Sequence, residues 1–137
     1  MPPACVSSFS AGPRWLIDGM NLIGSRPTGW WRDRPRAMRD LVGELAALVA
    51  ATGAPVTVVF DGGPFELEAQ GVEVAFAPRG GRDAADDEIV RMVERDAAPG
   101  ELRVVTSDAG LADRVRPLGA QIVTAGTFRR HLDDTNC

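Results

Sequence analysis

Five short apolar runs are spaced along the chain, and each ends at a polar or turn-forming residue. Nearly continuous apolar runs of this length are typical of strands that are covered on both faces. They predict strands at residues 14–18, 55–60, 72–77, 102–106 and 120–123. Between them, apolar residues recur with helical spacing, which predicts helices at residues 35–53, 83–99, 109–116 and 124–132. Residues 19–34, which contain three glycines and one proline, are predicted to form a loop.

The alternation of strands and helices predicts an α/β fold. Strands that are joined through helices pair in parallel, with right-handed crossovers. We therefore expect three layers, in which helices flank a mostly parallel sheet of about five strands. The expected domain spans residues 14–134, after a flexible N-terminal leader at residues 1–13 and before a C-terminal tail at residues 135–137.

Four aspartates stand where an apolar run stops or where a helix starts. Asp18, Asp61 and Asp108 follow three of the predicted strands, and Asp86 lies in the first turn of a predicted helix. The carboxyl ends of parallel strands lie along one rim of the sheet, where ligands bind in open α/β folds. Neighbouring strands are about 4.8 Å apart, so these acids are expected to share one small pocket.

Such an acidic pocket is unfavourable without compensation. Two like charges 4 Å apart repel by about 4 kcal/mol at an effective dielectric constant near 20. Either a divalent cation neutralises the cluster or some of the acids hold protons. We expect the cation, and because oxygen ligands suit hard ions, we expect Mg²⁺ or Mn²⁺.

Composition narrows the chemistry further. The chain of 137 residues contains 15 arginines and no lysine, which excludes lysine-dependent catalysis and the phosphate loop that ends in Gly-Lys-Ser/Thr. The net charge of −4 argues weakly against a nucleic-acid partner. Residues 26–39, however, hold five arginines and one aspartate, which is a local balance of +4.

Two cysteines, Cys5 and Cys137, do not suggest a disulfide framework, so a cytoplasmic location is expected. The first residues lack the features of a signal peptide. The longest uncharged run, at residues 45–60, is broken by Gly53 and Pro55, so no membrane association is expected.

Four short motifs resemble, in the correct order, those of a known family. They are Asp18-Gly19-Met20-Asn21-Leu22-Ile23-Gly24, Val58-Val59-Phe60-Asp61, Ala85-Asp86-Asp87-Glu88-Ile89 and Val105-Thr106-Ser107-Asp108. Together they resemble the NYN domains, a branch of the PIN-like nuclease superfamily, and are most similar to its small bacterial YacP-like group. The resemblance runs from about residue 14 to residue 133 and implies a PIN-like, Rossmann-like sheet.

The resemblance also implies an activity and roles for residues. The implied protein is a Mg²⁺- or Mn²⁺-dependent ribonuclease in which Asp18, Asp86 and Asp108 bind the metal. Asn21 corresponds to the polar companion of the first acid, and Asp61 to a supporting acid. Asp87 and Asp113 match the acidic positions of the family less closely. Association with ribosomes or messenger RNA is implied by the resemblance alone.

Each acid also has a purely structural interpretation. Asp18 and Asp61 precede glycines and could be turn residues. Asp86 could complete a capping box with Asp83, and Asp108 could cap the next helix. Asp87 could serve only to stabilise the helix dipole.

Several other side chains are candidates for contact with single-stranded RNA. Trp30 and Trp31 could stack on bases, or they could cover a hydrophobic patch. The arginines could bind phosphates, or they could be solvated surface residues. Thr106 and Ser107 could bind a phosphate or hydrogen-bond to the backbone. The arginines concerned are Arg26, Arg32, Arg79 and Arg82.

The sequence therefore favours an endoribonuclease that hydrolyses phosphodiester bonds with a metal-activated water. The alternative is a non-catalytic RNA-binding module that keeps the PIN-like fold. A phosphatase of the haloacid dehalogenase type, or a phospho-receiver domain, is less favoured, because Met20 stands where those phosphatases have a second aspartate and because both groups use a lysine.

Overall fold

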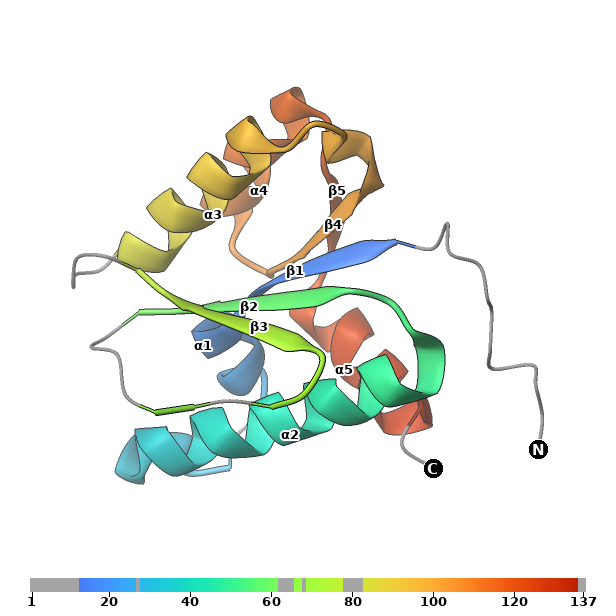
Figure 1. Cartoon of the computed structure of the whole chain (residues 1–137). Coiled ribbons are helices and arrows are strands. Elements are labelled where there is room, and N and C mark those ends of the chain that lie inside the picture. The colour runs from blue at the N-terminus through green and yellow to red at the C-terminus, as the bar shows by residue number, and fades with distance from the viewer. Residues whose placement is uncertain (1–12, 27, 62–65, 68, 78–82, 136–137) are drawn as a thin grey trace.

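A parallel five-stranded sheet forms the centre of the computed structural model, which describes residues 13–26, 28–61, 66–67, 69–77 and 83–135. The strand order is β3-β2-β1-β4-β5 (Figure 1). The strands are β1 (Arg14–Asp18), β2 (Val56–Phe60), β3 (Val72–Phe76), β4 (Leu102–Val105) and β5 (Gln121–Val123). The predicted α/β fold is confirmed. Residues 1–12 of the predicted leader and residues 136–137 of the predicted tail lie outside the described residues.

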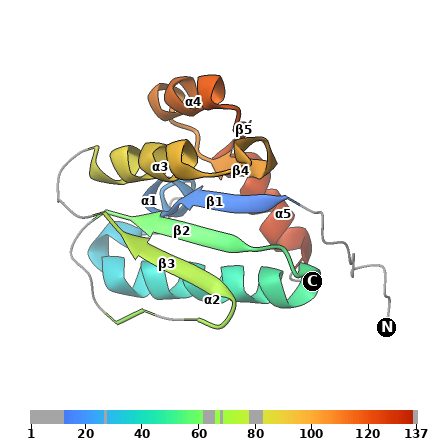
Figure 2. The same cartoon turned by 45° about the horizontal axis from the view of Figure 1, so that its top comes forward.

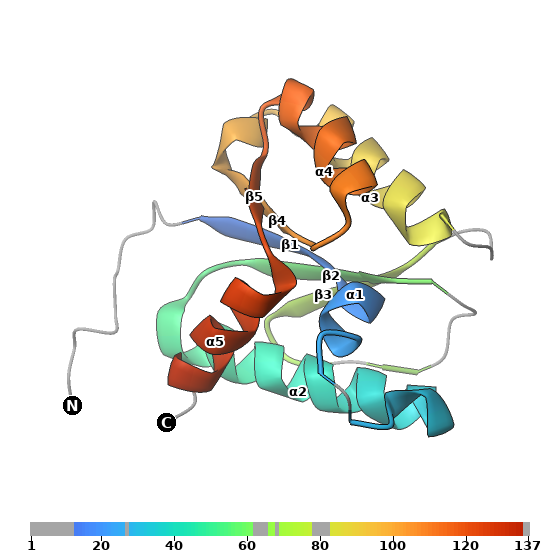
Figure 3. The same ribbon diagram turned by 180° about the vertical axis from the view of Figure 1, so that it is seen from behind.

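Helices cover both faces of this sheet, which gives the expected three layers (Figures 1 and 2). One face carries α3 (Ala84–Arg95) and α4 (Ala109–Val115). The other face carries α1 (Gly19–Ile23), α2 (Arg34–Thr52) and α5 (Ala125–Thr135), which contact one another (Figure 3). Short 3₁₀ turns occur at η2 (Trp30–Arg32), η3 (Pro99–Glu101) and η4 (Arg116–Leu118). Within the described ranges, no helix has the length and apolar character needed to cross a membrane.

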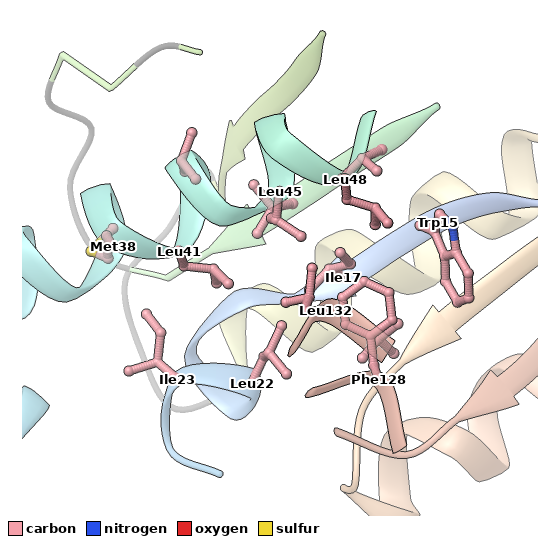
Figure 4. Close-up of a cluster of buried hydrophobic side chains, with 14 of the residues drawn as sticks. Trp15, Ile17, Leu22, Ile23, Met38, Leu41, Leu45, Leu48, Phe128 and Leu132 are labelled. Atoms are coloured by element: carbon pink, nitrogen blue, oxygen red, sulfur yellow. The ribbon is translucent and has the colours of Figure 1, made fainter. Parts of the chain in front are cut away.

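Successive side chains of β1 enter two different hydrophobic cores. Trp15 and Ile17 belong to the core beneath α1, α2 and α5, whereas Leu16 belongs to the core beneath α3 and α4. In the first core, shown in Figure 4, the rings of Trp15 and Phe128 have centroids 4.8 Å apart. Helix α2 adds the buried residues Leu41, Leu45 and Leu48. Burial of each leucine contributes roughly 1.5–3 kcal/mol, so this packing fixes β1 firmly beneath the helices.

The predicted loop at residues 19–34 is wrong, because it contains a helix and a 3₁₀ turn. Helix α1 begins directly after Asp18 and buries Leu22 and Ile23. A Cβ atom at Gly19 would stand 2.4 Å from Phe60 Cε1, so the chain can turn into a helix here only because residue 19 has no side chain. Five residues are too few to show a helical period, which is why the pattern did not predict α1.

Three helix ends also differ from the predictions. Helix α3 ends at Arg95, before Pro99, because Asp96 adopts an extended conformation. The predicted capping box at Asp83 is wrong, since its side chain makes no capping hydrogen bond. Helix α5 continues to Thr135, so the first residue of the predicted tail is helical.

The direction of the chain connections reverses between β1 and β4. From β1 the chain proceeds to β2 and β3 on one side, and from β4 it proceeds to β5 on the other. Outside the carboxyl ends of strands, such a reversal is the usual position of a ligand site in open α/β sheets. Asp18 is the last residue of β1, and residues 106–108 follow β4, so the fold places these segments at the reversal.

Candidate active site

The carboxylate of Asp18 is buried at the end of β1, and the side chain of Thr106 holds it there. Asp18 is 6% exposed and Thr106 is 1% exposed. The Thr106 hydroxyl donates a hydrogen bond of 3.0 Å to Asp18 Oδ2. These two are the buried polar side chains within the described part of the chain. A polar pair in a dry position at the sheet reversal points to a functional site rather than to a simple turn.

Thr106 also connects Asp18 to Asp108. Its Oγ1 accepts a hydrogen bond of 3.1 Å from the backbone N–H of Asp108. Asp108 Oδ1 in turn accepts from the backbone N–H groups of Gly110 and Leu111, at 2.8 and 3.2 Å. Asp108 is therefore the N-cap of α4, as its structural interpretation predicts, and the cap fixes the carboxylate next to Thr106.

Asn21 and Ser107 join the two segments that follow β1 and β4. Asn21 Oδ1 accepts a 2.8 Å hydrogen bond from the backbone N–H of Ser107. Ser107 Oγ accepts a 3.0 Å bond from the backbone N–H of Ala125 at the start of α5. In the sequence analysis both residues were candidates for direct roles. The structure gives them bonds that position the backbone around Asp18.

Asp86 and Asp108 lie close enough to Asp18 to affect its protonation. Burial is the main cause that raises the pKa of Asp18 to about 7, and the charges of Asp86 and Asp108 raise it further. The Thr106 hydroxyl and the backbone amide of Asn21 oppose this shift.

The pKa of Asp86 is raised to about 6. Burial is again the main cause, followed by the charges of Asp108 and Asp83, while Arg114 acts in the opposite direction. Perturbed carboxyl groups that lie together are a physical indicator of a functional site.

The donor atoms of this acid cluster, defined as Asp18, Asp86 and Asp108, suit a hard divalent cation. All are carboxylate oxygens, and their mutual repulsion is the kind that a cation relieves. Within the described residues, however, no three His, Cys, Asp or Glu side chains form a group already arranged to hold a metal ion. The acids are therefore electrostatic neighbours that are not arranged as a ready set of ligands.

Ion pairs involve the other acids at this end of the sheet. Asp87 on α3 accepts a 2.9 Å bond from Arg114 of α4, and Asp61, just after β2, accepts a 2.9 Å bond from Arg34. Asp113 pairs with Arg116 at 3.4 Å and is largely exposed. Arg114, which lowers the pKa of Asp86, was not among the predicted site residues. Its position 27 residues from Asp87 left no local signal for that pair.

The candidate RNA-binding residues fall into separate places. Arg26 forms an ion pair with Asp133 at 2.6 Å, beside an open groove of about 710 Å³ between α2 and α5. Trp30 packs against the core, whereas Trp31 is 57% exposed. The guanidinium of Arg32 lies 5.9 Å from the Trp31 ring centroid. Arg79 and Arg82 lie outside the described residues.

The acid cluster does not line either of two grooves formed by described residues. The 710 Å³ groove is lined by residues of α2 and α5 and by the segment after α1. A second groove, of about 420 Å³, includes Arg14, Pro55 and Leu102, at the opposite end of the strands. The cluster therefore lies outside both of these grooves, at the rim of the sheet.

The sequence matches the YacP-like NYN domain over residues 15–137. The chain belongs to the YacP-like NYN domain family. The resemblance carried by the four motifs is thereby confirmed, and YacP-like NYN membership suggests a nuclease-like function related to RNA.

Two solved structures of this YacP-like type have the same fold. The crystal structure of Rae1 (YacP) from Bacillus subtilis superposes with a TM-score of 0.74, and that of a point mutant of it superposes with a TM-score of 0.77. Both are 25% identical to this chain. The matches cover 90% of this chain and 75% and 77%, respectively, of the Rae1 chains. No curated protein matches the sequence significantly.

Proposed function

We propose that this protein is a metal-dependent endoribonuclease that hydrolyses RNA phosphodiester bonds at the acid cluster. The observation that carries the proposal is the buried Asp18 carboxylate, whose pKa is raised to about 7 by burial and by Asp86 and Asp108. A fold gains nothing in stability from such an arrangement, so a role in binding or chemistry is the better explanation. Family membership supports the same class of activity. We place this activity in the cytoplasm.

Asp18, Asp86 and Asp108 would hold the ion. Mg²⁺ or Mn²⁺ bound there would activate water and stabilise negative charge on the phosphate. Both ions keep part of their water shell, so a small number of protein ligands is sufficient.

The chain's own residues set the orientation and charge of these acids. Thr106 holds Asp18 Oδ2 by its hydroxyl, and the N-cap contacts hold Asp108 Oδ1. Arg114 moderates the negative field at Asp86. Asn21 ties the segment after β4 to α1 through the backbone of Ser107. Together these contacts fix the Asp18 and Asp108 carboxylates before any ligand arrives.

A cleavage assay with purified protein tests the proposal. RNA should be cleaved internally in Mn²⁺ or Mg²⁺, and EDTA should stop the reaction. Asp18→Asn and Asp108→Asn should each lose at least 100-fold in rate, the scale of transition-state electrostatic contributions. Glu101→Gln is the matched control, because Glu101 is an exposed acid paired with Arg14 at the other end of the strands. Full activity in Asp18→Asn would reject the assignment.

One observation favours a second candidate, a non-catalytic RNA-binding module. The described acids are not gathered into a ready ligand set. Such a module would bind RNA equally well with or without EDTA, and it would produce no cleavage in any divalent cation. Measurement of binding and turnover on the same preparation therefore distinguishes the two candidates.

A further inference from the structure

Trp31 stands out on the surface of the molecule. It is 57% exposed and is the one large hydrophobic side chain that is exposed among the described residues. Its neighbour Trp30 is different, because it packs against the hydrophobic core and meets Trp31 edge-on with ring centroids 5.9 Å apart. Trp30 thus anchors the 3₁₀ turn, and the turn presents the indole of Trp31 to solvent.

The surroundings of Trp31 are cationic. The guanidinium of Arg32 lies 5.9 Å from the centroid of the Trp31 ring, in cation–π range. Arg34 begins α2 three residues further on, and residues 26–39 hold five arginines and one aspartate, of which Arg26 and Arg34 pair with Asp133 and Asp61. An exposed aromatic ring among arginines is complementary to a strand with anionic phosphates and flat bases. A hydrophobic protein partner would not require this charge.

The Trp31 turn lies at the same end of the sheet as the acid cluster. Arg34 bonds to Asp61, which directly follows β2, at 2.9 Å. Asp18 pairs with Val59 in the sheet, two residues before Asp61. Strand spacing and rise then place the Cα atoms of Asp18 and Asp61 about 8 Å apart. Figure 1 shows the start of α2, the end of β2 and the start of α3 at this same end.

We propose that Trp31 stacks on an unpaired base of an RNA strand whose scissile phosphate lies at the acid cluster. Arg32 and Arg34 contact the phosphates between the two points. The inference rests on the proposed function and deepens it, because it assigns single-stranded RNA as the substrate class. Bases in a duplex are stacked on one another and leave no face for the indole, so paired RNA would not use this contact.

Binding measured in EDTA separates this inference from catalysis. The probes are a 12-nucleotide oligouridylate, the same strand in a duplex with oligoadenylate, and an abasic oligomer of the same length. Wild-type protein should bind the single strand best, and its tryptophan fluorescence should be quenched. Trp31→Leu should weaken binding of oligouridylate by about 5- to 150-fold, whereas Trp31→Phe should retain most of it.

Charge and stacking can be separated with a second pair of variants. Arg32→Ala should reduce the dependence of log affinity on log salt by about 0.7, the value for one phosphate contact on a single strand. Arg116→Ala removes an exposed arginine paired with Asp113 and should leave that slope unchanged. For the abasic oligomer, Trp31→Leu should bind as wild type does, because that oligomer has nothing to stack.

The possible outcomes are distinct. If Trp31→Leu binds oligouridylate as tightly as wild type does, the stacking platform is disproved. It is also disproved if wild-type protein binds the abasic oligomer as tightly as oligouridylate. If only a protein contact depends on Trp31, the surface is a protein-docking site and the inference is wrong. If binding depends on Trp31 but no RNA is cleaved in Mn²⁺, the platform stands and the endoribonuclease proposal fails.

Discussion

Thr106 Oγ1 lies 3.0 Å from Asp18 Oδ2 and 3.1 Å from the backbone nitrogen of Asp108, so one hydroxyl serves both acids. It donates to the first residue and accepts from the second. Because Thr106 is 1% exposed, water cannot substitute for either contact. The geometry of the acid cluster therefore depends on a residue that is not itself ionisable.

Replacement of Thr106 should show this dependence. In Thr106→Val the backbone N–H of Asp108 loses its acceptor and Asp18 loses a donor, which should lower the free energy of unfolding by about 1–3 kcal/mol. The pKa of Asp18 should rise further, because the Thr106 hydroxyl lowers it in the wild type. The acid limb of the pH–rate profile should therefore shift to higher pH. Thr106→Ser keeps the hydroxyl and should resemble wild type. Urea unfolding and rate measurements from pH 5 to pH 9 test both, and equal behaviour of the two variants would contradict this role.

Stability without metal should depend on pH through Asp18 and Asp86, whose pKa values are raised to about 7 and about 6. Below pH 4 these carboxyls are protonated in both folded and unfolded states. As pH rises from 4 to 7, the unfolded chain releases protons that the folded chain retains, so the free energy of unfolding falls. The raised pKa of Asp18 alone should lower the free energy of unfolding by about 4 kcal/mol above pH 7.

Asp18→Asn should remove much of this dependence and raise the melting temperature at pH 8. Thermal melting in EDTA at pH 5, 6, 7 and 8 measures the effect. Asp113→Asn is the control, because it carries the same chemical change at an exposed position. A melting temperature of wild type that is flat over this range would show that the Asp18 carboxyl is not perturbed.

A divalent cation should restore the stability that the metal-free protein loses as the pH rises. At a Mn²⁺ concentration 100 times its dissociation constant, the protein should gain about 2.7 kcal/mol of stability at pH 8. The shift should be absent in Asp18→Asn and smaller at pH 5, where protons compete for the carboxylates. Differential scanning calorimetry with Mn²⁺ or Mg²⁺ measures it. An equal shift in wild type and Asp18→Asn would place the ion elsewhere.

The ion pair between Arg14 and Asp96 should stabilise the protein at neutral pH. Arg14 donates two hydrogen bonds of 2.8 Å to the Asp96 carboxylate. This contact is the main cause that lowers the pKa of Asp96 to about 2. The stabilisation is present above pH 4 and is lost as pH falls toward 2. Asp96→Asn should therefore cost roughly 1–2 kcal/mol at pH 7 and almost nothing at pH 2, which urea unfolding at both values can measure.

A methyl group at residue 19 should disturb the entry to α1. In Gly19→Ala the new Cβ would meet the ring of Phe60 at 2.4 Å, so the ring or the helix has to move. Overpacking of this kind costs about 1–3 kcal/mol. Gly43→Ala in α2 has no atom within 4 Å of the new Cβ and should gain up to about 1 kcal/mol from helix propensity. Urea unfolding gives the free energy of unfolding of both variants. Equal values would contradict a steric clash between residue 19 and Phe60.

The sheet and the longer helices could be predicted from sequence because each depends on its own residues. The run at residues 56–60 is short, apolar and rich in β-branched residues, which favours a strand, and Gly53 ends α2 with a left-handed conformation at φ 75°. Helix α1 was missed because its five residues are too few to show a helical period, and it is held by the burial of Leu22 and Ile23 in the core.

The predicted positions of the acids at strand ends agree with the fold, but their partners could not be derived from the chain. Arg114 meets Asp87, and Arg34 meets Asp61, only after helices pack on the sheet. Burial of Thr106 likewise depends on the surrounding elements. Local patterns identify the charged groups, and tertiary packing decides which charges are compensated.

The burial of Asp18 sets two selective pressures against each other at one position. A library of variants screened only for survival of heat at pH 8 without metal should become enriched in neutral residues at position 18. A library screened for turnover should keep aspartate there and recover thermal resistance at distant sites. Sequencing of both libraries would show whether the protein tolerates this weakness because its chemistry requires it.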